Sequence, residues 1–192
     1  IGEGNLCIKS AWPSICRSIY GDQACFESTY FTSFPGYFFT GDSARRDADG
    51  YIWVTGRVDD LINVSGHLLS TAEIEAALAS DSDVAEVAVV AVPHEIKGSS
   101  PYAFLCLRNG VKFTEEKMNY LKSLVRGKIG PIAIPDVIQN VPVLPKTRSG
   151  KTPRRILRKV AKGDRNLGDT SSLINRKIID VLWKSRRVSH SG

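Results

Sequence analysis

The fold is decided by residues 84–92, which read VAEVAVVAV. A run this apolar and this rich in valine is typical of a strand that is covered on both faces. Further out along the chain, residues 102–107 and 136–141 predict two more strands. The centre of the chain is therefore expected to be a sheet built on one deeply buried strand.

Helices are predicted beside these strands. Residues 71–80 place their apolar side chains on one helical face, and Ser70 or Thr71 can cap the helix start. Thr114 is expected to cap a second helix, which Gly130-Pro131 ends.

The chain is expected to contain two domains. Strands and helices interleave between residues 61 and 163, which predicts a compact α+β unit. Residues 1–59 are rich in β signals instead, and the sequence Asp-Ala-Asp-Gly at 47–50 predicts a hairpin turn. We predict an incomplete first domain over 1–59, a second over 60–165 and a C-terminal extension over 166–192.

The remaining elements are predicted from local pattern and turn residues. Strands are expected at 5–10, 37–40, 43–46, 51–55 and 61–67, and helices at 22–34 and, weakly, at 175–184.

Composition is that of an ordinary globular protein, with a net charge of +6 that favours anionic partners. No apolar run approaches the roughly 20 residues that cross a bilayer. The four cysteines are too far apart for a CxxC metal site, so we expect unpaired thiols in a reducing compartment. The start at Ile1 has no initiator Met and is not a signal peptide, which suggests a cut through a longer protein.

Residues 145–151, Pro-Lys-Thr-Arg-Ser-Gly-Lys, form the segment with the clearest chemical character. Lys151 follows a glycine, so we expect it on a short mobile loop. Pro153 is predicted at the first position of the next helix. A compact ammonium on such a loop suits a transient contact with a phosphate or carboxylate oxygen.

Two other segments carry candidate binding residues. Asp42 is expected on a turn after an aromatic strand, where it can accept hydrogen bonds from ribose hydroxyls or merely stabilise its own turn. Arg57 can donate to a nucleotide or form a surface pair with an aspartate, and Asp59 falls where a hinge would lie. Ser65 and Gly66 offer a hydroxyl and an open backbone to a thin ligand.

The basic helix after Pro153 has a nucleic-acid interpretation as well. Its cations can contact phosphates, but no aromatic residues interleave with them for base stacking. A solvated basic face is the simpler interpretation of this helix.

Five segments together resemble the C-terminal part of acetyl-CoA synthetases, AMP-forming acyl-CoA ligases of the adenylate-forming superfamily. The segments are residues 36–42, 56–67, 71–75, 145–151 and 167–170. The resemblance implies that residues 1–59 end a large β-rich AMP-binding domain and that residues 60–165 are a small mobile α+β lid. It also implies that Asp59 is the hinge between them.

The resemblance implies a ligase reaction in two halves. Acetate attacks the α-phosphate of ATP to give acetyl-AMP and pyrophosphate, the lid rotates, and the thiol of coenzyme A then attacks the adenylate. Acetate, ATP with Mg²⁺, and coenzyme A are the implied substrates. The phosphate loop and the adenine and acyl pockets lie upstream in this family, so this chain alone is not expected to catalyse the full reaction.

Residue roles are implied position by position. Lys151 matches the adenylation lysine, which is also the family's target of reversible acetylation, so a lysine acetyltransferase and a deacetylase are expected partners. The other matches are Asp42 and Arg57 for the nucleotide, Ser65, Gly66 and Arg126 for coenzyme A, and the carbonyls of Ala79, Asp81 and Val84 for a magnesium ion. Asp81 stands where the family has a histidine.

One departure leaves the activity open. Leu68 replaces the family's phosphate-contacting arginine, so either another cation substitutes for it or adenylation is weakened. The alternatives are a propionyl- or other short-chain acyl-CoA ligase and a catalytically weakened regulatory relic. We expect a cytoplasmic or nucleocytosolic location and neither a membrane nor a specific nucleic acid as partner.

Overall fold

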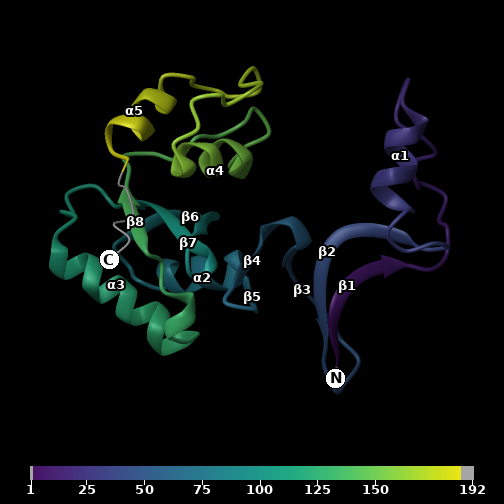
Figure 1. The fold of residues 1–192 in the computed structure, drawn as a ribbon, viewed down its shortest axis with the longest axis horizontal. Coiled ribbons are helices and arrows are strands. Elements are labelled where there is room, and N and C mark those ends of the chain that lie inside the picture. The colour runs from purple at the N-terminus through teal and green to yellow at the C-terminus, as the bar shows by residue number, and fades with distance from the viewer. Residues whose placement is uncertain (1, 187–192) are drawn as a thin grey trace. The chain divides into compact units, whose positions relative to one another are not determined.

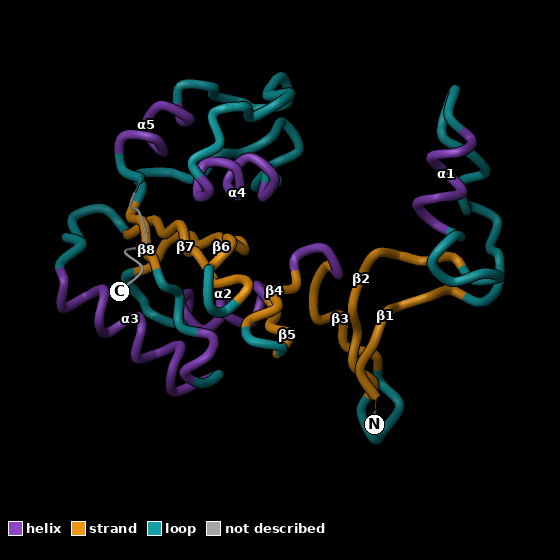
Figure 2. Tube along the Cα trace, viewed as in Figure 1, coloured by secondary structure: helices purple, strands orange, loops and turns teal. Residues whose placement is uncertain are grey.

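The computed structural model describes residues 2–186 and divides the chain into two compact units, Ile1–Asp59 and Asp60–Gly192. A short 3₁₀ turn, η1 (Val58–Asp60), lies at the boundary. Figures 1 and 2 show the helices and strands of each unit. Antiparallel sheets combined with helices confirm the predicted α+β class.

Unit 1 is a three-stranded antiparallel sheet with a helix inserted before its second strand. Its elements are β1 (Gly2–Ile8), α1 (Gln23–Tyr30), β2 (Phe38–Arg46) and β3 (Ile52–Arg57), and the strand order is β1-β2-β3. The carboxylate of Asp22 caps α1 by accepting the backbone N–H of Cys25 at 2.9 Å.

The predicted hairpin turn at residues 47–50 is confirmed between β2 and β3. The Asp47 carboxylate accepts a hydrogen bond from the indole Nε1 of Trp53 at 2.7 Å and from the backbone N–H groups of Tyr51 and Asp49. These bonds, led by that of Trp53, lower the pKa of Asp47 because they favour its charged form.

Residues 38–46 form the single strand β2, so the prediction of two strands at 37–40 and 43–46 was wrong. Gly41 at φ 76° and an irregular register between Ser43 and Ala44 bend the strand without ending it. Asp42 consequently lies inside β2, opposite Arg57, and not on a turn after the strand.

Unit 2 is built on a five-stranded sheet. Its strands are β4 (Leu61–Val64), β5 (His67–Ser70), β6 (Val84–His94), β7 (Gly98–Leu107) and β8 (Val137–Asn140). The order is β5-β4-β7-β6, and β8 pairs with β7 in parallel. The antiparallel β6–β7 pair runs from Val84 opposite Leu107 to His94 opposite Gly98.

Helices cover both faces of this sheet (Figure 1). Alternate residues of β6 point to opposite sides, so Ala88, Val90 and Val92 pack against α4 (Arg154–Lys162) and α5 (Ile178–Lys184). Val84 and Val89 pack on the other side, against α2 (Thr71–Ala79) and α3 (Glu115–Lys128). The prediction of a strand covered on both faces is confirmed.

Residues 61–67, predicted as one strand, are part of the β4–β5 hairpin. Ser65 and Gly66 have φ values of 51° and 88°, which reverse the chain between the two strands. The carbonyl of Lys97 accepts the Ser65 N–H at 2.9 Å, and the side chain of Asn63 accepts the Gly66 N–H at 3.0 Å.

Helix ends largely follow the sequence signals. The hydroxyl of Thr114 caps α3 by accepting the N–H of Lys117, and Gly130 precedes the 3₁₀ turn η2 (Pro131–Ala133). Pro153, however, is the residue before α4 and not its first residue, because its ψ of 85° is not helical.

The predicted C-terminal extension packs into unit 2, as far as residue 186. Leu173, Ile178 and Leu182 are buried, and two of them join the core that covers β6 and β7. The fully buried Gln139 accepts a hydrogen bond from the hydroxyl of Tyr102 and donates to the carbonyl of Leu182 and the hydroxyl of Ser185. Residues 187–192 of the extension lie outside the described part of the chain.

All four cysteines are free thiols, as predicted. Cys106 is buried, and this burial raises its pKa to about 11. None of the helices within residues 2–186 is both long and apolar enough to cross a membrane.

Replacing Gln139 with leucine should lower the free energy of unfolding by about 1–3 kcal/mol, since buried polar groups of β7 and α5 lose their partner. Urea unfolding measures this loss. Gln23→Leu, at an exposed site on α1, is the matched control and should change little. Equal stability of the two variants would contradict the role of Gln139 in docking α5 on the sheet.

Candidate active-site elements

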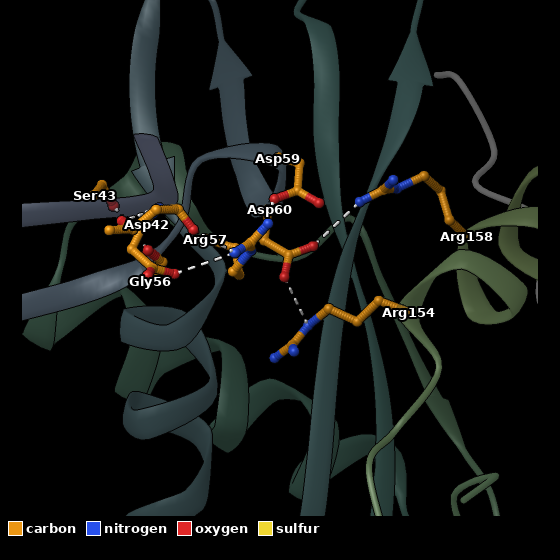
Figure 3. A network of polar contacts seen from close by, with 9 residues as sticks. Asp42, Ser43, Gly56, Arg57, Asp59, Asp60, Arg154 and Arg158 are labelled. Atoms are coloured by element: carbon orange, nitrogen blue, oxygen red, sulfur yellow. Dashed lines mark hydrogen bonds and ion pairs between the residues drawn. The ribbon is translucent and has the colours of Figure 1, made fainter. Parts of the chain in front are cut away.

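Unit 1 brings together three of the predicted site residues, as Figure 3 shows. The guanidinium of Arg57 donates to the Asp42 carboxylate at 3.4 Å, to the Thr40 carbonyl at 3.0 Å and to the Asp59 carboxylate at 3.2 Å. The Asp42 and Arg57 side chains are 31% and 52% exposed, so water screens the ion pair and its contribution to stability is at most about 1 kcal/mol. A pair this loosely held can exchange partners with a ligand.

Gly41 is required beside this cluster. A Cβ at position 41 would lie 2.6 Å from an Arg57 guanidinium nitrogen, and the φ of 76° is unfavourable for other residues. The guanidinium therefore lies flat against the backbone of β2, next to Asp42.

The lysine loop, residues 145–151, is closed by its own hydrogen bonds. The Lys151 carbonyl accepts the Thr147 N–H at 2.8 Å, and the Thr147 hydroxyl accepts the Lys151 N–H at 3.2 Å. Gly150 provides the turn, with φ 78°. The Lys151 side chain is exposed, and no ion pair or side-chain hydrogen bond within residues 2–186 engages its ammonium.

Two other cations near this loop have acidic partners. Lys146 lies 2.6 Å from the Glu86 carboxylate, and Arg154 lies 2.7 Å from both carboxylate oxygens of Glu75. Arg154 and Arg158 also approach the Asp60 carboxylate, at 3.6 and 3.3 Å (Figure 3).

This anchoring of α4 was missed by sequence reasoning, which predicted a solvated basic face. Arg154 and Arg158 are four residues apart and therefore share one side of the helix, which was the available signal. Their acidic partners, Asp60 and Glu75, are 79 or more residues away in sequence and only the fold brings them close. Glu75 also accepts the N–H of Val89, so it ties α4 to the central strand.

The residues predicted to contact coenzyme A lie on two elements of unit 2. Ser65 and Gly66 form the exposed β4–β5 turn, and a Cβ at Gly66 would meet no atom within 4 Å, so one side of the turn is open. Arg126 is exposed on α3, and no hydrogen bond or ion pair in residues 2–186 joins it to the turn. Leu68, on β5, has 68% of its surface exposed.

At the predicted magnesium position, the side chain of Asp81 is poorly suited to bind a metal ion. The Asp81 carboxylate is 4% exposed and lies 2.7 Å from the ammonium of Lys117, which is also 2.6 Å from Asp83. The backbone carbonyl of Asp81 accepts the N–H of Val84. Residues 2–186 contain no group of three or more His, Cys, Asp or Glu that could hold a metal. A lysine already supplies the positive charge here.

Comparison with known proteins identifies the core of unit 2. Residues 73–151 match the family model described as the AMP-binding enzyme C-terminal domain. This stretch of the chain is therefore similar to an AMP-binding C-terminal domain. Over 97% of its length the chain is 54% identical to an acetyl-coenzyme A synthetase from Drosophila melanogaster, of which it spans 28%. The predicted resemblance is confirmed.

Solved structures agree with this assignment. An acetoacetyl-CoA synthetase from Streptomyces lividans shares the fold over 95% of this chain and 28% of its own, with a TM-score of 0.82 at 20% identity. The anthranilate CoA ligase AuaEII, solved in complex with anthranoyl-AMP, matches 84% of this chain and 30% of its own, with a TM-score of 0.71 at 30% identity. In both structures the matched part is less than a third of a longer chain.

Replacing Asp81 with asparagine should destabilise the protein by about 1–2 kcal/mol at pH 7, because the Lys117 ammonium loses the more buried of its two charged partners. Burial opposes ionisation of Asp81, but the hydrogen bonds from Lys117 and the Asp83 N–H hold its pKa below the usual value. A lowered carboxyl pKa stabilises the fold above the unfolded-state value, and the stabilisation disappears as pH falls through the folded-state value.

The difference between wild type and Asp81→Asn should therefore shrink below about pH 4, as measured by chemical unfolding across pH. Asp83→Asn, whose side chain is 44% exposed, is the control and should have a smaller effect at pH 7. A difference that stays constant down to pH 3 would contradict the charge pairing.

Proposed function

We propose that this chain is the C-terminal part of an AMP-forming acetyl-CoA synthetase, which joins acetate to coenzyme A at the expense of ATP. The observation that carries the proposal is the exposed Lys151, whose ammonium has no ion pair or side-chain hydrogen bond within residues 2–186, whereas Lys146 and Arg154 on either side of it are paired with acidic side chains. This loop belongs to an AMP-binding C-terminal domain whose relative from Drosophila melanogaster is an acetyl-coenzyme A synthetase. The chain spans less than a third of that relative, so the activity belongs to the whole enzyme.

In the first half-reaction Lys151 offsets the negative charge that accumulates where the acetate oxygen meets the α-phosphate of ATP. An acetate oxygen attacks the α-phosphorus of ATP, a new P–O bond forms, and pyrophosphate leaves with its bonding electrons. The ammonium of Lys151 stabilises the oxygens that share this charge in the transition state. The Mg²⁺ that accompanies ATP supplies further charge neutralisation.

Asp42 and Arg57 are assigned to the nucleotide. The carboxylate of Asp42 can accept both vicinal hydroxyls of the ribose, and the Arg57 guanidinium retains donors for the sugar or phosphate beyond its contacts with Thr40 and Asp59. Asp59 is the proposed hinge, next to the boundary between the two compact units.

In the second half-reaction the thiolate of coenzyme A attacks the acetyl carbonyl, and AMP leaves. The open Ser65-Gly66 turn is the proposed wall of the pantetheine channel, and Arg126 the proposed contact of the 3′-phosphate. Domain alternation explains why one lysine serves only the first half: rotation about Asp59 takes Lys151 away and brings the turn in.

Reversible acetylation of Lys151 would act as an off switch for the first half-reaction, because it removes the ammonium charge. The exposed side chain is compatible with a modifying acetyltransferase and a deacetylase. We assign the enzyme to the cytoplasm or to both cytoplasm and nucleus. Two of the five cations on α4, Arg154 and Arg158, are paired with acidic side chains, which favours a structural role for this side of the helix over nucleic-acid binding.

In the whole enzyme, Lys151→Ala should reduce acetate-dependent ATP–pyrophosphate exchange by at least about 100-fold, because the transition state loses its cation. Thioester formation from supplied acetyl-AMP should stay within a few-fold of wild type. Lys162→Ala, which removes an exposed cation from the end of α4, is the matched control and should leave both reactions intact. Unchanged exchange in Lys151→Ala would reject the role of Lys151.

Leu68→Arg addresses the alternative of a weakened relic. Arginine at this exposed position should raise the exchange rate by about 10-fold if the phosphate contact is missing, since one charge-assisted hydrogen bond is worth about that much. Leu68→Lys tests whether a positive charge is sufficient without the two donor groups of a guanidinium. An unchanged rate in an active enzyme would show that another cation already fills the role.

Exchange assays with propionate in place of acetate decide between acetyl and longer acyl substrates.

A further inference from the structure

The lysine loop forms backbone hydrogen bonds with residues 172–174, which lie more than twenty residues further along the chain. The Arg148 N–H donates to the Ser172 carbonyl at 3.0 Å, and the Ile174 N–H donates to the Lys146 carbonyl at 3.0 Å. Thr147 and Leu173 face each other between these bonds as an antiparallel bridge. The loop therefore has a backbone partner on one side.

This partner segment, residues 166–174, is called the brace here. Leu173 anchors it in the core, with 4% of its surface exposed. Arg155, on α4, donates from its guanidinium to the carbonyls of Leu167 and Asp169, at 2.7 and 2.5 Å. Lys159, one turn further along α4, donates to the carbonyl of Asn166.

Gly168 lets the brace lie close to Arg155. Its φ is 66°, and a Cβ at this position would be 2.9 Å from a guanidinium nitrogen of Arg155. The two carbonyls that Arg155 binds lie on either side of Gly168, so the guanidinium fixes the turn from within.

A continuous set of contacts thus leads from α4 to the catalytic candidate. Arg155 holds the brace, the brace pairs with Thr147, and the Thr147 N–H and hydroxyl both bond to the backbone of Lys151. Without the brace, the exposed residues 148–150 would have only the loop's internal bonds to restrict them. A cation that must meet a transition state benefits from being restricted to the productive position beforehand.

We propose that the brace, residues 166–174, positions Lys151 for adenylation and that Arg155 is the positioning residue that holds the brace. This proposal rests on the function proposed above for Lys151. Arg155 itself touches no reacting atom in this scheme, because both of its bonds go to brace carbonyls.

The test uses Arg155→Gln in the whole enzyme, with Lys162→Gln as the matched loss of a cation from the same helix. Arg155→Gln should lower the kcat of ATP–pyrophosphate exchange by about 10- to 100-fold, the scale of a misplaced catalytic group, with little change in the KM for acetate or ATP. Thioester formation from supplied acetyl-AMP should change less than about two-fold. Arg155→Lys, which retains one donor, should recover part of the rate, and Lys162→Gln should behave as wild type.

Gly168→Ala is the second route to the same end, because its methyl group displaces the guanidinium without removing it. It should reduce exchange in the same half-reaction, and it serves if Arg155→Gln does not fold. In both variants the amides of Arg148 and Ile174 should exchange hydrogen faster than in wild type, which reports the pairing directly.

Three results would overturn the proposal. They are unchanged exchange in Arg155→Gln, an equal loss in both half-reactions with a lowered melting temperature, and unchanged protection of the two amides. Lys151→Ala, assayed in parallel, separates the two hypotheses. If Lys151→Ala loses exchange and Arg155→Gln does not, the brace is rejected alone, whereas an active Lys151→Ala rejects the proposed function.

Discussion

Burial of the β6–β7 pair on both faces is the constraint on which unit 2 depends. Ten of the eleven residues of β6 pair with β7, and alternate side chains supply apolar surface to helices on each side. At roughly 25 cal/mol per Å² of apolar surface removed from water, this hairpin stabilises the core on both of its faces. Helix α4 can bury its apolar side only against this face, which is what brings the lysine loop beside the sheet.

Ion pairs add to the apolar contacts that hold α4 on the sheet. The apolar side of α4 sets its distance from the sheet, while Arg154 and Arg158 fix its orientation through Glu75 and Asp60. The acidic partners are buried or partly buried, so these pairs are screened less than surface pairs. The net positive charge of the chain is therefore not an undifferentiated basic surface. Part of it is structural, whereas the exposed Lys151 has no acidic partner within residues 2–186.

Much of the fold was predictable because apolar patterning is local. The nearly continuous apolar run of β6, the Thr114 cap and the Asp47–Gly50 turn each depend on neighbours in sequence, and the structure confirms all three. The β4–β5 hairpin was missed because Ser65, a residue that seldom has positive φ, sits in the turn. The Ser-Gly pair was the overlooked signal.

The contacts in the candidate site that the sequence did not predict join residues that are far apart along the chain. Arg158 and Asp60 are 98 residues apart, and Asp81 and Lys117 are 36 apart, so no local pattern links them. Motif resemblance led to the proposal that Lys151 is the reactive cation, whereas its lack of an acidic partner within residues 2–186 became visible only in three dimensions. The pairing of the lysine loop with residues 172–174 likewise had no signature in the sequence, since both strands are too short to show alternation.

That pairing also affects any enzyme that must bind the lysine loop as an extended peptide. Many proteases and modifying enzymes bind their substrates as extended strands, through the same backbone N–H and C=O groups that a sheet neighbour uses. Here Ser172 and Ile174 already occupy those groups at Arg148 and Lys146, and Thr147 occupies the carbonyl of Lys151. Such an enzyme has to compete with an intramolecular strand, and the C-terminal segment therefore acts as a built-in competitive ligand for the peptide that carries the lysine.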